Sequence, residues 1–314
     1  MAQTDYAYAI ARIRSREMSL LTSQDFDLLI NAATPEDALT ILAGKGYSTG
    51  NGDMLEREME QAYSFITESV DNKDEFSSLI IDNDYQNLKA AIKARFASVP
   101  AEGYMVAPSL VDSSLVIKAV NENSFELLPE FLSVPGEEAY RKLANGFTGQ
   151  AAEAVIDYFA ENEKADRAAK SESEILIYKA KIENAVCDIK TAKRCAMTSK
   201  NREEALQWLG GRGGIDKEKL LDTAYGGGSL KEILIESGLE EISEEGDGNF
   251  TALENKRDEL FLNKAKGTKF DIYGANAVAA YYILKEFETR NIRVILSAKK
   301  AGISNDEIRE KVRA

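Results

Sequence analysis

The sequence predicts an all-α protein. Two long stretches, residues 171–197 and 274–302, place apolar residues at steps of three and four, which is the spacing of one helix face. No series of alternating strands with Asn-Gly or Asp-Gly turns is present. Short signatures also recur about every 100 residues, which predicts that similar helical units follow one another.

The C-terminal stretch 274–302 has the features of one long helix. It contains no proline, and its apolar seam is interrupted by Glu288. Lys299 and Lys300 precede Gly302, and cations followed by glycine are typical of a helix C-terminus. We therefore expect the helix to end at Gly302.

The stretch 171–197 predicts a second long helix, with Ser171 or Ser173 as its N-cap. Cys187 and Cys195 both fall within it. Eight residues of helix separate two Cα atoms by about 12 Å, too far for a disulfide. Two isolated thiols without histidine also make a poor zinc site and suit a reducing compartment.

Prolines mark several element boundaries. Pro35 precedes Glu36 and Asp37, which is typical of the first turn of a helix. The other four prolines are expected in loops or at helix starts: Pro100, Pro108, Pro129 and Pro135.

The short, largely apolar segment SSLIID (77–82) is interpreted as helix rather than strand.

Three signatures repeat along the chain in the same order. The first is a small or apolar residue before Glu, with another acid four residues later: Leu55-Glu56…Glu60, Ala152-Glu153…Asp157 and Leu253-Glu254…Asp258. The second combines Asn or Asp, Leu or Ile, and a cation: Asn87-Leu88-Lys89, Asp188-Ile189-Lys190 and Asn291-Ile292-Arg293, with a degenerate form at Arg12-Ile13-Arg14. The third is an apolar set with constant offsets: Leu29, Ala33, Leu39, Leu42; Leu115, Ala119, Phe125, Leu128; and Leu220, Ala224, Leu230, Ile233.

These repeats predict three related helical units, over residues 1–100, 101–205 and 206–314. The C-terminal fragment completes the pattern of the first unit, so we expect the N- and C-terminal helices to pack together. A closed set of three units implies a pseudo-three-fold shape with a central depression.

Composition excludes several functional classes. The chain has 314 residues and no histidine, which removes Ser-His-Asp triads, Cys-His pairs and HExxH zinc helices. Its 39 Lys and Arg against 53 Asp and Glu give a net charge of −14. That balance argues against a nucleic-acid partner, because phosphate binding needs a basic surface. No cofactor or metal is predicted.

The N-terminal residues 1–19 lack the basic start, apolar core and cleavage site of a signal peptide. No apolar run reaches the roughly 18 residues of a transmembrane helix. We therefore expect a cytoplasmic protein that reaches a membrane only through a partner.

Two glycine-rich segments, GGRGG (210–214) and GGG (226–228), have two interpretations. Their N–H groups could cradle a phosphate, but neither segment matches GxGxxG after a strand or GxxxxGK[ST]. The alternative, which we favour, is that they are turns, because glycine tolerates positive φ.

Two smaller groups of polar residues favour structural roles. Three repeated acids could bind metal or act as acids and bases, but their repeat positions suggest ion pairing or capping instead: Glu60, Asp157 and Asp258. Four tyrosines flank the expected meeting point of the termini and are assigned to core packing: Tyr6, Tyr8, Tyr281 and Tyr282.

Basic residues cluster at equivalent positions of the repeats. On an acidic chain, such clusters could form a rim that meets an acidic partner; the alternative is a solvated helix face. The candidate partner contacts are Arg12, Arg14, Lys89, Lys93, Lys190, Lys193, Arg194, Arg293, Lys299 and Lys300. Charge reversal of Lys190, Lys193 and Arg194 together is expected to weaken assembly of the chain with such a partner.

Three segments carry a resemblance to a known family: AAYYILKEFETRNIRVILSAKKAGISNDEIREKV (279–312), YAIARIRSREMSLLTSQDFDLLINA (8–32) and NLKAAIKARF (87–96). They resemble the C-subunit family of V-type and A-type rotary ATPases (ATP synthases), which includes the d subunit of vacuolar enzymes. The similarity extends over nearly the whole chain. One departure is Ala185, at the position of Asp84 and Glu288.

The resemblance implies a non-catalytic, funnel-shaped helical subunit. Such a subunit lies on the cytoplasmic side of the membrane proteolipid ring, receives the central-stalk subunits and transmits torque for ATP-coupled H⁺ or Na⁺ transport. Two alternatives are a stand-alone helical scaffold, and an enzyme that binds a phosphorylated small molecule through Gly211 and Gly213.

Overall fold

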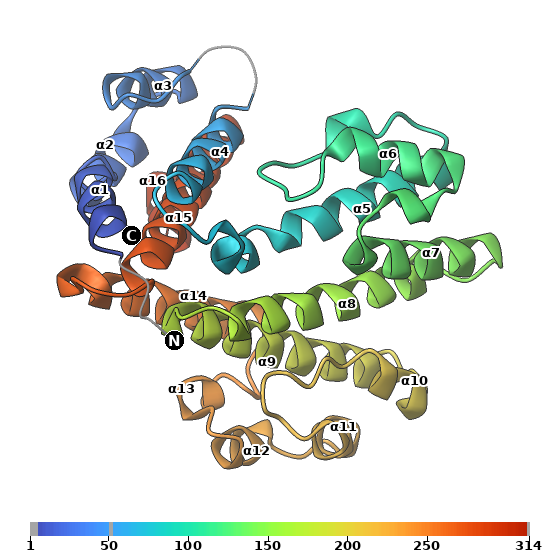
Figure 1. Cartoon of the computed structure of the whole chain (residues 1–314). Coiled ribbons are helices and arrows are strands. Elements are labelled where there is room, and N and C mark those ends of the chain that lie inside the picture. Colours follow the sequence, from blue (N-terminus) through green and yellow to red (C-terminus); the bar gives the residue numbers. More distant parts are fainter. Residues whose placement is uncertain (1–5, 50–52, 313–314) are drawn as a thin grey trace. The chain divides into compact units, whose positions relative to one another are not determined.

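The structure is a computed structural model that describes residues 6–49 and 53–312, and every regular element within them is a helix (Figure 1). The all-α prediction is therefore confirmed. By compactness, the chain divides into two units. Unit 1 combines residues 1–74 with 261–314, and unit 2 comprises residues 75–260. This division by compactness differs from the division by sequence repeats, so the repeat boundaries near residues 100 and 205 stay predictions.

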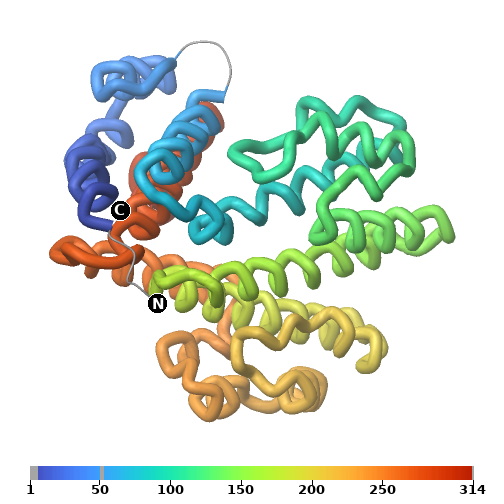
Figure 2. The backbone as a smooth tube through the Cα atoms, in the orientation of Figure 1, coloured from blue at the N-terminus to red at the C-terminus, as the bar shows by residue number. Residues whose placement is uncertain are grey.

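Unit 1 is built around its longest helix, α15 (Asn276–Lys300). Its helices are α1 (Ala7–Glu17), α2 (Ser23–Asn31), α3 (Pro35–Gly44), α4 (Met54–Thr67), η4 (Thr268–Phe270), α15 (Asn276–Lys300) and α16 (Asn305–Lys311). Helices α1 to α4 precede α15 in the chain and α16 follows it, and all five contact α15. Figure 2 shows α15 running beside α4.

The two ends of the chain share one hydrophobic core. Leu29 and Leu42 from the N-terminal helices pack in the same buried cluster as Ile292 and Ile295 of α15. This arrangement confirms the expectation that the N- and C-terminal helices pack together.

Unit 2 contains the two long helices α8 and α9, which lie side by side (Figure 1). Its elements are α5 (Ile81–Ala97), η2 (Glu102–Tyr104), α6 (Ser113–Glu122), η3 (Phe125–Leu127), α7 (Glu130–Ala144), α8 (Gly149–Ala169), α9 (Glu174–Met197), α10 (Arg202–Gln207), α11 (Lys217–Gly226), α12 (Leu230–Glu236) and α13 (Glu240–Ser243). Two further helices, η1 (Lys73–Leu79) and α14 (Phe250–Gly267), cross the boundary between the units.

The repeat is visible as one long helix that carries a lobe of short helices. In unit 2, α6 packs on α5, and α11 packs on α9. In unit 1, α2 and α3 pack on α15. Each of the three apolar sets with constant offsets lies on these short segments: α2–α3, α6–η3 and α11–α12.

The three helices that carry the lobes, α5, α9 and α15, also end alike. Ser98, Ser199 and Gly302 each follow the middle residue of the second signature by ten positions, and all three have positive φ, at 57°, 52° and 71°. A left-handed residue after the last turn satisfies free carbonyls of the helix. The expected stop at Gly302 is thus confirmed.

The expected helix starts agree with the structure with one exception. Ser173 caps α9 by accepting a hydrogen bond from the Leu176 N–H, and Pro35 occupies the first turn of α3. Pro135, however, lies inside α7 rather than in a loop or at a start, so that prediction is wrong. A proline leaves the carbonyl four residues earlier without its helical donor. Here the Tyr85 hydroxyl donates to that carbonyl, on Phe131, at 2.9 Å.

The cysteines behave as the sequence predicts. Cys187 and Cys195 both lie in α9 and are free thiols.

No helix of the described residues is long and apolar enough to cross a bilayer.

Candidate partner surfaces and a polar cavity

The ten basic residues predicted as partner contacts lie on α1, α5, α9 and α15. Most of their charged groups contact other residues of the chain. The contacts follow the repeat pattern, and they show what holds each long helix to its neighbours.

On α5, Lys89 pairs with Asp157 and Lys93 pairs with Glu153, both on α8. The Lys89 side chain is mostly buried, whereas that of Lys93 remains 59% exposed. Ion pairs at exposed positions contribute little to stability, and their cations stay accessible to a partner.

On α9, Lys190 pairs with Glu254 of α14. The Lys193 ammonium donates to the carbonyls of Gly246 and Gly248, at 3.1 and 2.6 Å. Arg194 is exposed, and its guanidinium lies 5.8 Å from the centre of the Phe250 ring.

On α15, Arg293 is 64% exposed and lies 3.7 Å from Asp53. Lys299 donates to the carbonyls of Ile30 and Ala32, both at 2.6 Å, and so closes the end of α2. Lys300 is exposed.

On α1, the two arginines are held within unit 1. Arg12 lies over the Phe65 ring at 4.4 Å. Arg14 pairs with Glu17 at 2.7 Å and donates to the carbonyls of Thr268 and Asp271, at 2.6 and 3.0 Å.

The first two sequence signatures are therefore partners in space. The cation of one repeat pairs with an acid next to or within the Glu signature of the following repeat: Lys89 with Asp157, Lys190 with Glu254, and Arg293 with Asp53. The third pair joins the last repeat to the first, within unit 1. Of the acids for which the sequence favoured ion pairing or capping, Asp157 belongs to these pairs.

Of the two remaining repeated acids, Asp258 fits the same structural role. Asp258 is buried and accepts hydrogen bonds from the guanidinium of Arg257, and Glu60 lies exposed on α4. Within the part of the chain that the structure describes, no three His, Cys, Asp or Glu residues are grouped to hold a metal ion.

The tyrosines near the termini divide. Tyr6, Tyr281 and Tyr282 are buried, as expected, and Tyr282 contacts the ring of Tyr63 edge to face. Tyr8 is 66% exposed, so its assignment to the core is wrong. It lies on the solvent side of the first turn of α1.

The GGRGG segment wraps around side chains of α9 instead of an outside anion. Asp188 accepts the N–H groups of Gly210 and Gly211, both at 2.8 Å. Asn184 accepts those of Arg212 and Gly213, at 2.8 and 3.0 Å. The donors that could cradle a phosphate already have partners, and this finding supports the turn interpretation.

The tight fit also explains why alanine occupies position 185. A Cβ atom added to Gly213 would lie 2.6 Å from the backbone of Ala185, so the loop packs directly on α9. In the other repeats an acid stands at this position and holds its own loop. Asp84 accepts the N–H groups of Leu110 and Val111 at 2.9 and 2.8 Å.

In unit 1 the equivalent acid is Glu288. It accepts the Leu21 N–H and the Tyr47 hydroxyl, and Lys285 lies 2.8 Å away. Each of the helices α5, α9 and α15 thus uses buried polar residues to hold the segment that leads into its lobe.

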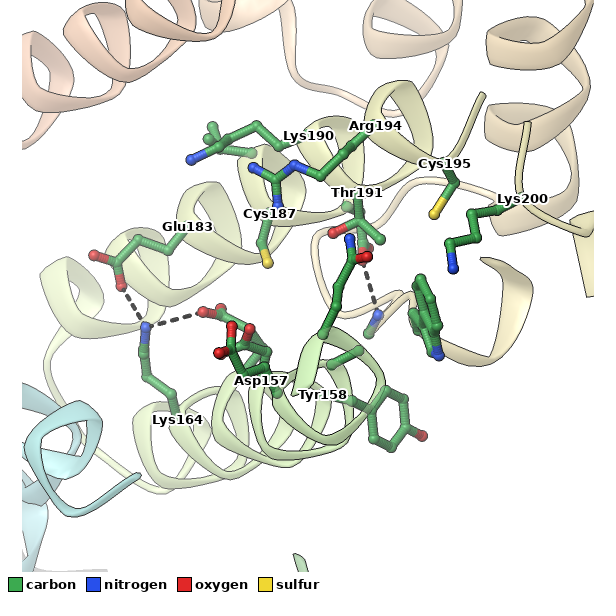
Figure 3. A pocket seen from close by; sticks show the side chains of 18 of the residues that line it. Asp157, Tyr158, Lys164, Glu183, Cys187, Lys190, Thr191, Arg194, Cys195 and Lys200 are labelled. Atoms are coloured by element: carbon green, nitrogen blue, oxygen red, sulfur yellow. Dashed lines mark hydrogen bonds and ion pairs between the residues drawn. The ribbon is translucent and has the colours of Figure 1, made fainter. Parts of the chain in front are cut away.

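A feature that the sequence analysis missed is a buried charge cluster in unit 2 (Figure 3). Lys164 on α8 lies 2.7 Å from Asp82 of α5, 3.4 Å from Glu161 and 3.3 Å from Glu183 of α9. Burial alone would lower the pKa of Lys164, but the carboxylates raise it well above its usual value. The ammonium therefore stays charged and links three helices.

The carboxylates of this cluster differ in pKa. Burial raises the pKa of Glu161 above its usual value. Burial acts in the same direction on Glu183, but Lys164 and Lys179 outweigh it and lower the pKa of Glu183 to about 2. The Lys179 ammonium lies 2.6 Å from the Glu183 carboxylate.

Beside the cluster, a cavity of about 380 Å³ opens between α8 and α9 (Figure 3). Its lining mixes both signs of charge and includes Glu161, Arg194, Lys200 and Trp208. Cys187 also faces it, but burial raises the pKa of this thiol to about 12, so it is not an activated nucleophile.

Comparison with known proteins gives similarity along almost the whole chain. The chain matches the family described as ATP synthase (C/AC39) subunit over residues 9–311. It is 24% identical to the A-type ATP synthase C subunit of Thermococcus kodakarensis and 23% identical to that of Thermococcus onnurineus, in each case over 98% of this chain and 90% of the relative. The A-type ATP synthase C subunit of Desulfurococcus sp. is 27% identical over 46% of this chain and 43% of the relative. The chain belongs to the ATP synthase (C/AC39) subunit family.

Proposed function

We propose that this chain is a non-catalytic rotor subunit that links the central stalk of a V/A-type ATPase to its membrane proteolipid ring. The family match over residues 9–311 carries the proposal. In this role the protein lies on the cytoplasmic face of the membrane and transmits torque for ATP-coupled H⁺ or Na⁺ transport.

Torque transmission requires helices that do not slide under load. The Lys164 cluster is suited to this requirement, because one buried cation joins α5, α8 and α9. Removal of one partner from such a cluster leaves an uncompensated buried charge, which costs about 3–5 kcal/mol. The repeated polar contacts between the long helices and the lobe segments also resist sliding, because they hold each lobe to its helix.

The basic clusters are proposed to contact acidic surfaces of the stalk or ring. The exposed members suit this role: Lys93, Arg194, Arg293 and Lys300. The more enclosed members, such as Lys299 and Arg14, position these surfaces through their contacts within the chain.

Affinity purification of the tagged chain from detergent-solubilised native membranes tests the proposal. The expected result is one copy of this chain with stalk subunits, a proteolipid ring and ATPase activity. Recovery of the chain alone, from a soluble fraction, while the ATPase remains intact without it, would favour a stand-alone helical scaffold.

Charge reversal tests the contact residues. Reversal of Lys190, Lys193 and Arg194 should release the chain from the complex, but it also breaks the pair between Lys190 and Glu254. Arg194→Glu with Lys300→Glu avoids this effect, because both side chains are exposed. Full retention of the folded double variant would remove Arg194 and Lys300 from the interface.

A further inference from the structure

One segment of unit 1 exposes an unusual amount of apolar surface. Within four residues, Phe270 is 85% exposed, Ile272 is 64% exposed and Tyr273 is 75% exposed. Single exposed apolar residues are normal on a protein surface, but a contiguous group indicates contact with another molecule or with a membrane.

The chain holds this segment in place. Thr268 is buried, and its hydroxyl donates to the Ala265 carbonyl at 2.8 Å. Arg14 of α1 donates to the carbonyls of Thr268 and Asp271. Backbone contacts on either side of Phe270 therefore fix the turn, and its apolar side chains extend to solvent instead of folding into the core.

The charge around the segment is opposite to that of the chain. Residues 264–273 (KAKGTKFDIY) contain three Lys and one Asp, a local balance of +2 in a protein of net charge −14. Lys266 and Lys269 are exposed, and the Lys269 ammonium lies 5.9 Å from the centre of the Phe270 ring. Cations thus adjoin the apolar side chains.

We propose that residues 266–273 form a peripheral contact with an anionic phospholipid surface. Phe270, Ile272 and Tyr273 enter the headgroup boundary, where aromatic side chains are favoured, and the lysines contact lipid phosphates. The complementary charge favours an anionic surface over a neutral one. A fluid lipid interface also accepts a protruding turn without a preformed pocket.

Vesicle sedimentation of the full chain tests this contact. We expect binding to vesicles of phosphatidylglycerol and phosphatidylcholine in equal amounts, and much weaker binding to phosphatidylcholine alone. The combined variant Phe270→Ser, Ile272→Ser and Tyr273→Ser should lower the partition coefficient about tenfold or more, because it removes the inserted apolar surface.

A matched control removes as many exposed apolar side chains from unit 2: Tyr104→Ser, Phe147→Ser and Met197→Ser. These residues are 63%, 58% and 77% exposed, and their loss should leave vesicle binding unchanged. Circular dichroism establishes that both variants remain folded.

The electrostatic part has its own readout. Lys266→Gln and Lys269→Gln should each reduce binding to anionic vesicles about fivefold at low salt, and added salt should remove this difference.

Three results would overturn the proposal: no binding of the wild-type chain to anionic vesicles at low salt, equal binding of the serine variant, or equal loss in the control. A serine variant that no longer joins the detergent-solubilised ATPase, together with a wild-type chain that ignores vesicles, would assign the segment to a protein partner instead. That outcome would contradict the lipid contact and leave the proposed rotor function standing.

Discussion

The carboxylate of Asp188 gives the sharpest test of the loop-holding contacts. It is 3% exposed and accepts two backbone N–H groups of the glycine-rich segment. Burial nevertheless raises its pKa from 3.8 to about 6. The folded protein therefore binds a proton more tightly at this site than the unfolded chain does.

The direction of the pH effect follows from linkage. The stabilisation by the proton on Asp188 is complete below pH 3.8 and is lost as the pH rises through about 6. The total is about 3 kcal/mol, and about 1.4 kcal/mol of it falls between pH 8 and pH 5. The range from pH 8 to pH 5 lies above the isoelectric point of about 4.8, so the protein carries a net negative charge throughout it.

The variant Asp188→Asn removes the titration. Relative to this variant, the free energy of unfolding of the wild type should rise by about 1.4 kcal/mol as the pH falls from 8 to 5. Urea unfolding followed by fluorescence measures it, because the single tryptophan of the chain, Trp208, precedes Gly210 by two residues.

Asp247 provides a matched control in the same unit. It also accepts a backbone N–H, from Leu230, and a hydrogen bond from Ser229. Burial acts to raise its pKa, but these bonds keep the value below the ordinary 3.8. Asp247→Asn should therefore change stability by a constant amount from pH 8 to pH 5. A constant difference for Asp188→Asn as well would refute the reasoning.

Two further predictions concern backbone fit, and urea unfolding measures both. Tyr85→Phe should lower the free energy of unfolding by about 1–2 kcal/mol, because it leaves the Phe131 carbonyl without its donor. Adding Pro135→Ala to this variant should recover much of the loss by restoring the helical N–H. A loss that persists unchanged in the double variant would contradict the proposed role of the Tyr85 hydroxyl. Gly213→Ala should destabilise by about 1–3 kcal/mol, because its Cβ meets the α9 backbone, whereas Gly226→Ala, with nothing within 4 Å, should not destabilise. Equal effects of the two alanines would exclude the packing argument.

The long helices and their repetition were predictable because periodicity and caps are local properties of the sequence. The seam from Ala277 to Ile295 predicted α15, and repeated short patterns predicted that the chain ends would meet. Pro135 was misplaced, because the donor that replaces its missing N–H comes from Tyr85, fifty residues earlier.

The buried cluster around Lys164 was only partly visible in the sequence. Ile156, Ala160 and Ala168 are spaced by multiples of four from Lys164, and all are buried, so the pattern places a lysine on a buried helix face. Its main partner, Asp82, lies on a helix that pattern reasoning does not pair with α8. Partners of basic residues depend on such long-range packing, which periodicity does not encode.

Torque transmission is the central claim, and ATP-driven ion transport in a reconstituted complex tests it most directly. Removal of this chain from the purified complex should leave ATP hydrolysis by the catalytic head but abolish ion transport into vesicles. Addition of the purified chain should restore transport. Undiminished ATP-driven transport in a complex shown to lack the chain would contradict the account.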